Sequence, residues 1–249
     1  MNSRPSNNTF NSLPSQVKCK KLVLKVYKHN SSEIHKLVLV EFFIDRKFLG
    51  KNTFYKEVIT INLIDLNSPN FQEFAFSAHY LPVSPLEEKE KISLTNGHVF
   101  IPHQDCRGYR IGTWVMNEIV TWASQWPNAD IVKILLGDGD ATTENKVRRN
   151  KFYEGFGIKF NYFEDNKLSG YSFPMKSSDL TNNKSWDKNF SGNIEVVDLV
   201  DFIKEITKEL RCANKKVAVV KNLRNYPSSN KVQKKSFLSF VKSFFRNED

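Results

Sequence analysis

The stretch from residue 98 to residue 175 alternates strand-like and helix-like segments, and this alternation limits the folds open to the chain more than any other feature. Runs of β-branched and large apolar residues predict strands, and apolar residues at helical spacing predict helices. The expected order is strand His98–Pro102, helix Thr113–Trp126, strand Ile131–Leu136, helix Glu144–Phe156, and a hairpin of Phe160–Phe163 with Gly170–Met175. Strands that alternate with helices in this way predict a mixed α/β domain.

The chain before residue 98 is expected to supply further strands. Phe71–Tyr80 is ambiguous, and a short helix is one interpretation of it. Lys91–Leu94 and His98–Pro102 are expected to pair around Asn96 and Gly97, because Asn-Gly between apolar runs favours a hairpin turn. Three segments rich in β-branched and aromatic residues predict strands: Lys21–Tyr27, Lys36–Ile44 and Phe54–Asp65.

Composition excludes several classes of protein. The 249 residues are 40% hydrophobic and include 20 Phe, which is enough apolar surface for a core and argues against a disordered chain. The three cysteines form no CxxC pair, so neither a disulfide scaffold nor a structural zinc site is expected, and a reducing, cytoplasmic compartment is favoured. Residues 1–16 lack the apolar core of a signal peptide, and no run is long enough to span a membrane.

The positive charge is concentrated near the C-terminus. Residues 202–246 hold twelve basic and two acidic residues, which accounts for the formal net charge of +10. The segment is expected to contain helices at Ile194–Leu210 and Ser236–Phe245, with a basic loop at 215–230 in which Val217–Val220 is a candidate strand. A Phe-rich helix face can pack on the core or form a dimer, and the basic residues can bind nucleic acid or an anionic membrane, or can simply keep the segment soluble.

These patterns divide the chain into four expected parts. The predicted boundaries are a disordered lead-in at 1–18, a folded domain at 19–176, a linker at 177–193, and a basic, partly helical extension at 194–249.

The run Arg107–Gly112 is the strongest candidate for a binding site. Gly108 and Gly112 allow the backbone to approach a ligand closely, and the first N–H groups of the helix that follows favour an anion. Arg107 and Arg110 add fixed positive charge that suits phosphate oxygens. The sequence therefore predicts a pyrophosphate cradle made by Arg107, Gly108, Tyr109, Arg110, Ile111, Gly112 and Thr113.

A second motif makes the chain resemble a known family. After the cradle and one strand come Asn145, then Phe152-Tyr153, then Gly157 and Ile158. The two motifs in this order are similar to those of the GNAT superfamily of acyl-CoA-dependent N-acetyltransferases, over roughly residues 90–175. That family writes its cradle as [R/Q]xxGx[G/A], so Arg107 and Gly112 match it and Arg110 stands where the middle glycine is usual.

The resemblance implies a fold and a chemistry. The fold would be a mixed, mainly antiparallel sheet with a central, splayed parallel pair, His98–Pro102 and Ile131–Leu136, flanked by helices. Acetyl-CoA would be the co-substrate, with Asn145 and the backbone of Val99 and Ile101 among its contacts. Its acetyl group would pass directly to an amine.

The resemblance assigns one of the two expected catalytic groups, the acid, and leaves the base open. The resemblance implies that Tyr153 protonates the departing thiolate. The base that deprotonates the amine is left open among His98, His103 and Asp105, and Cys106 has no evident activating partner. A module that kept the fold and lost the chemistry is the alternative.

Overall fold

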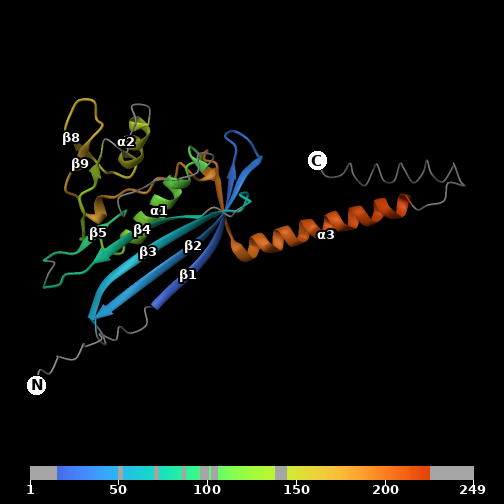
Figure 1. Ribbon diagram of the computed structural model, residues 1–249, viewed down its shortest axis with the longest axis horizontal. Coiled ribbons are helices and arrows are strands. Elements are labelled where there is room, and N and C mark those ends of the chain that lie inside the picture. Colours follow the sequence, from blue (N-terminus) through green and yellow to red (C-terminus); the bar gives the residue numbers. More distant parts are fainter. Residues whose placement is uncertain are drawn as a thin grey trace, which may run out of the picture. The chain divides into compact units, whose positions relative to one another are not determined.

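The computed structural model of this protein describes residues 16–49, 53–69, 73–85, 88–95, 101, 106–137 and 145–224. It is a mixed α/β fold with a mainly antiparallel open sheet (Figure 1). Seven strands are ordered β10-β1-β2-β3-β4-β5-β6, and a second sheet has the order β7-β9-β8. The strands are β1 Gln16–Tyr27, β2 Ile34–Leu49, β3 Thr53–Asp65, β4 Glu73–Leu81, β5 Lys91–Ser93, β6 Asp130–Ile131, β7 Leu135–Leu136, β8 Phe160–Tyr162, β9 Gly170–Ser172 and β10 Ile194–Asp198.

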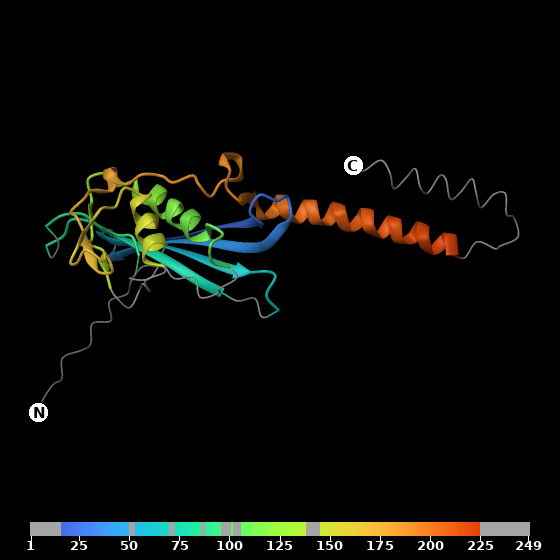
Figure 2. The same ribbon diagram turned by 90° about the horizontal axis from the view of Figure 1, so that it is seen from above.

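The described helices are few. They are α1 Ile111–Ala123, α2 Lys146–Glu154 and α3 Leu199–Arg224, with two short 3-10 turns at Ser177–Asp179 and Lys188–Phe190. Figure 2 shows α1 and α2 on the same side of the large sheet. The chain divides into two compact units, residues 1–199 and 200–249.

The long strands form because apolar residues recur at every second position. In β2, Val38, Val40 and Phe42 are buried and alternate with more exposed neighbours. Their common face meets α1, where the ring of Trp114 lies edge-on to Phe42 at 5.9 Å between centroids. The predictions for Lys21–Tyr27, Lys36–Ile44, Phe54–Asp65 and the helix Thr113–Trp126 are confirmed, with shifted ends.

The helical interpretation of Phe71–Tyr80 is wrong. Residues from Glu73 form β4, in which Phe74, Phe76, Ala78 and Tyr80 are buried. Their spacing of two is the period of a strand, and pairing with β3 buries that face against the core.

The predicted strand Ile131–Leu136 is divided between two sheets. Ile131 ends β6, which runs parallel to β5, whereas Leu135 and Leu136 form β7 and pair with β9. Between them, the backbone amide of Ile134 donates to the hydroxyl of Ser172, 3.0 Å away. The chain thus passes from the large sheet to the small one within these six residues. The described parallel partner of β6 is Lys91–Ile92, not His98–Pro102, most of which lies outside the described residues.

The region after residue 193 differs from the expected helix at Ile194–Leu210. Residues 194–198 form β10, because β1 offers an unpaired edge and Ile194 fits the buried position opposite Val26. α3 then runs from Leu199 to Arg224, so the candidate strand Val217–Val220 and the first part of the basic loop at 215–230 are helical. The predicted helix at Ser236–Phe245 lies outside the described residues, and β1 begins at Gln16, inside the predicted lead-in.

Candidate functional site

The segment that leads from Cys106 into α1 has an unusual backbone. Gly108 has φ +84°, and Arg110 has φ 62° and ψ 12°, so two of three successive residues are left-handed. An L-residue pays about 1–2 kcal/mol for this conformation, whereas glycine does not. The chain therefore keeps, at Arg110, the backbone geometry that a glycine would favour, although the side chain is large.

This segment leads directly into the N-terminus of α1. Arg110 is the N-cap residue, and the first helical hydrogen bond runs from the amide of Trp114 to the carbonyl of Arg110 at 2.9 Å. The amides of residues 111–113 precede that bond, and the first turn has no acidic residue. A Cβ built on Gly108 would meet no described atom within 4 Å. An anion can approach this turn without a competing carboxylate in it.

The loop is held by aromatic stacking. The ring of Tyr109 stacks on His35 at 4.2 Å and on His29 at 5.4 Å between centroids. The side-chain amide of Asn193 donates to the carbonyls of Tyr109 and Tyr27, at 3.2 and 3.3 Å. The strand β10, the hairpin between β1 and β2, and the loop are thereby fixed to one another.

The two arginines of the loop make internal contacts. The guanidinium of Arg110 donates to the carbonyls of Ser185 and Ser191, and Nε of Arg107 donates to the carbonyl of Ile101 at 2.8 Å. Both side chains thus help to hold the loop. Binding of phosphate by Arg107 and Arg110 stays a prediction, as does binding by Gly112 and Thr113, which are half-buried in the first turn of α1, and by Ile111, which is buried in the core.

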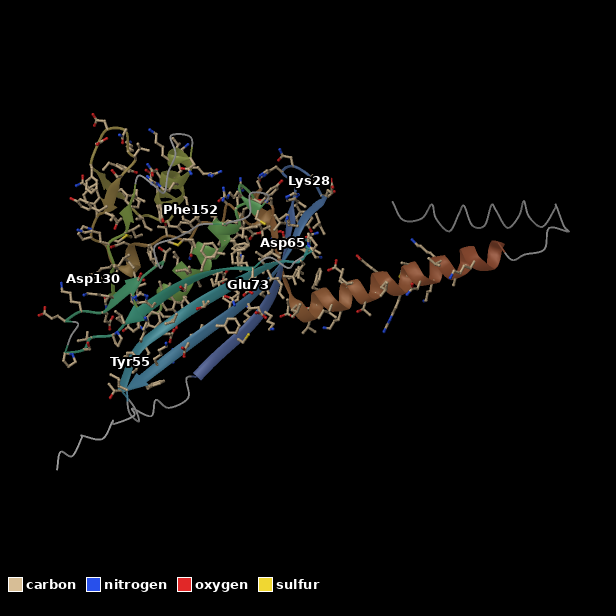
Figure 3. The ribbon with its side chains drawn as sticks, in the orientation of Figure 1. Lys28, Tyr55, Asp65, Glu73, Asp130 and Phe152 are labelled. Carbon is tan, nitrogen blue, oxygen red and sulfur yellow. The ribbon has the colours of Figure 1, made fainter. Side chains whose placement is uncertain are left out.

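A buried ionic cluster lies beneath the start of the loop. Nζ of Lys36 is 2.6 Å from Oδ2 of Asp65, and both side chains are less than a tenth exposed. The Cys106 thiol lies 4.0 Å from the same oxygen, and the backbone N–H of Asn67 donates to Oδ1 of Asp65 at 2.9 Å. Figure 3 shows Asp65 at the end of the sheet where the hairpin carries Lys28. Sequence reasoning missed this cluster, because residues 36, 65 and 106 are distant in the chain; their only signal was a charge at the end of an apolar run.

The second motif lies on and around α2. Asn145 is the N-cap residue of this helix, and Tyr153 is buried with 8% of its surface exposed. The Tyr153 ring packs edge-on against Phe152 and Phe160, at 5.2 and 5.4 Å. The neighbours of Tyr153 thus differ from those of the loop, which packs on the β1–β2 hairpin. Figure 3 shows Phe152 on α2.

The end of α2 is tightly constrained. Gly157 has φ +82°, and a Cβ there would lie 2.8 Å from the carbonyl oxygen of Asp179. The amide of Thr181 donates to the carbonyl of Phe156, so the segment at 179–181 closes over this turn. Gly157 and Ile158 are therefore explained by packing without reference to a ligand.

Several candidate residues lie outside the described part of the chain. They are His98, Val99, His103 and Asp105, so the candidate bases and half of the expected pantetheine contacts stay predictions. Among the described residues, no cluster of three or more His, Cys, Asp or Glu side chains could hold a metal ion. Within the same residues, no helix combines the length and apolar content that crossing a membrane requires.

Comparisons with models of protein families, with curated proteins and with solved structures give no match for this chain. The fold and the site together define a mixed α/β protein in which the turn before α1 is open to an anion.

Proposed function

We propose that this protein is an N-acetyltransferase that moves an acetyl group from acetyl-CoA to an amine. The observation that carries the proposal is the backbone of residues 107–112, with Gly108 and Arg110 left-handed and the N-terminus of α1 directly behind them. Backbone amides at the N-terminus of a helix, preceded by a turn with left-handed residues, suit a pyrophosphate. The resemblance of both motifs to the GNAT superfamily supports the same ligand.

In this proposal the loop binds and the sheet positions the co-substrate. The amides of residues 108–113 hold the diphosphate, with Arg107, Arg110 and Asn145 nearby, and the backbone of Val99 and Ile101 pairs with the pantetheine arm. The carbonyl of Ile101 can accept a second hydrogen bond besides that from Arg107, because a carbonyl oxygen has two lone pairs.

Acetyl transfer requires three proton transfers: two away from the acceptor nitrogen and one to the leaving sulfur. The acceptor amine must first lose a proton, because alkylamines are mostly protonated near neutral pH, and His98, His103 or Asp105 is the proposed base. The amine nitrogen then forms a bond to the thioester carbonyl carbon as the carbon–sulfur bond breaks. Tyr153 donates its phenolic proton to the leaving sulfur. The nitrogen, positively charged after the attack, then releases a second proton, which restores the Tyr153 phenol.

A second candidate function is a binding module without catalysis. The burial of Tyr153 between Phe152 and Phe160 favours it, since a catalytic phenol must reach the sulfur. The bonds from Arg110 to the carbonyls of Ser185 and Ser191 favour it as well, because they turn this guanidinium toward its own chain. Such a module would use the basic residues of 202–246 to bind nucleic acid.

Calorimetric titration of the full chain with acetyl-CoA, followed by release of free thiol with a panel of amines, tests both functions. The enzyme requires binding and turnover, and Tyr153→Phe should lower turnover about 100-fold or more. Tyr162→Phe is the matched control, because the buried Tyr162 hydroxyl has no partner among the described residues. Binding without turnover for any amine would favour the module, and no binding at sub-millimolar acetyl-CoA would reject the acetyltransferase.

The nucleic-acid proposal has its own test. Affinity for RNA or DNA should fall steeply with salt, and deletion of residues 202–246 should remove that affinity. Equal retention on nucleic acid after the deletion would discard this role for the basic segment.

A further inference from the structure

The helix α3 carries a narrow apolar seam. Apolar residues recur at alternating steps of three and four, the spacing of positions a and d in a heptad. Along the described helix these residues are Leu199, Ile203, Ile206, Leu210, Ala213 and Val217, and the same spacing continues to position 220. Ile203, Ile206, Leu210 and Val217 are 43–60% exposed.

The residues that flank the seam at positions e and g are polar from Thr207 on: Thr207, Glu209, Asn214, Lys216 and Lys221. Val200 and Phe202 widen the apolar face only at the start of the helix. A helix that lies on a membrane generally has a wider apolar face with large aromatic residues, whereas a strict a/d seam is typical of a coiled coil. The pattern therefore favours another helix as the occupant of this face.

We propose that α3 pairs with α3 of a second copy of this chain in an antiparallel coiled coil. In a parallel pair, Lys216 at position g would face Lys221 of the second copy, which is repulsive. In an antiparallel pair, Glu209 can face Lys216 of the second copy, and two-fold symmetry repeats this ion pair. Charge complementarity thus selects the antiparallel arrangement.

The same register also fills the seam. Leu210 meets Ala213 of the second copy, Ile206 meets Val217, and position 203 meets position 220. All of these layers combine a position a with a position d, as antiparallel packing requires. Ala213 buries little surface, so the dimer is expected to dissociate on dilution, and its population should depend on concentration.

Sedimentation of the full chain tests the proposal, from about 1 to about 200 µM so that a weak dimer would be seen. We expect a monomer–dimer equilibrium. Ile206→Asp should abolish the dimer, whereas Val219→Asp should preserve it, because Val219 lies off the seam. The two side chains form a matched pair, since they are 43% and 41% exposed.

Charge reversal tests the orientation. Glu209→Lys alone and Lys216→Glu alone should each weaken dimerisation about fivefold or more, because each replaces two attractive pairs with two repulsive ones. The double variant should restore the wild-type dissociation constant. Equal weakening by the double variant would overturn the antiparallel register.

Three further outcomes would overturn the proposal itself. A chain that stays monomeric over the whole range has no such pairing. A dimer that survives Ile206→Asp forms elsewhere on the chain. A monomer that binds vesicles of anionic phospholipid through Ile206 uses the seam for a lipid surface instead.

Discussion

The indole Nε1 of Trp122, on α1, donates a hydrogen bond of 2.8 Å to Oε1 of Glu57, in β3. The other carboxylate oxygen of Glu57 accepts from Nε of Arg46 in the neighbouring strand β2. Glu57 is 1% exposed, so its charge is kept in the interior by these two donors. One carboxylate thus joins the helix behind the candidate loop to two strands of the sheet.

Replacement of Glu57 by Ala should therefore lower the free energy of unfolding by about 3 kcal/mol, because Trp122 loses a charged acceptor and Arg46 loses its partner. Chemical denaturation with circular dichroism gives this value. Glu73→Ala on β4 is the control, since Glu73 is exposed and should change stability by about 0.5 kcal/mol or less. If the two replacements lowered the free energy of unfolding equally, the hydrogen bonds of Glu57 to Trp122 and Arg46 would make no net contribution to stability.

Arg110→Gly and Arg110→Ala should differ in stability although both remove the same guanidinium. Gly adopts the φ of 62° without strain, so Arg110→Gly should be more stable than Arg110→Ala by about 1 kcal/mol. Denaturation of both variants under the same conditions measures the difference. An alanine variant as stable as the glycine variant would show that residue 110 does not adopt a left-handed conformation.

Gly108→Ala and Gly157→Ala separate backbone strain from steric overlap. The two glycines have nearly the same φ, +84° and +82°, but only a Cβ at Gly157 approaches a backbone oxygen, that of Asp179 at 2.8 Å. Gly108→Ala should cost about 1 kcal/mol, and Gly157→Ala clearly more, with a lower Tm. Equal losses would contradict the close packing of residue 179 on this turn.

The buried phenol of Tyr80 should give the protein an alkaline stability dependence. Burial raises the pKa of Tyr80 from 10 to about 12, with a further contribution from the Glu90 carboxylate. Because the folded-state pKa is raised, the resulting stability is present below pH 10 and is lost as the pH rises to about 12. The stability difference between wild type and Tyr80→Phe should change by on the order of 2 kcal/mol across that window.

Tyrosinate absorbance provides an independent measurement. The wild-type titration should contain a late component that is reduced by one phenol in Tyr80→Phe; burial also raises the pKa of Tyr162, which the variant keeps. A difference in unfolding free energy that stays constant from pH 9 to about 12 would contradict the raised pKa.

The sequence indicated much of the fold wherever the pattern was local. Strand periodicity located β1, β2 and β3, and the helical spacing around Trp114 located α1. The segment Arg107–Gly112 was expected as a turn between strand and helix, and a turn leads into α1. Arg110 stands where the similar motif usually has a glycine. In the structure, the backbone of Arg110 is left-handed, the conformation that a glycine adopts without strain.

Local side-chain periodicity was sufficient to predict β1, β2, β3 and α1, because it acts over a few residues and these segments bury one regular face. Long-range pairing was needed to show that Ile194–Asp198 is a strand, since that depends on the edge of β1, and that Ile131–Leu136 divides between two sheets. The tertiary structure also decided that Asp65 meets Lys36 and that Glu57 meets Trp122. Buried charges need partners wherever the fold brings them, and those partners are 29 and 65 residues away.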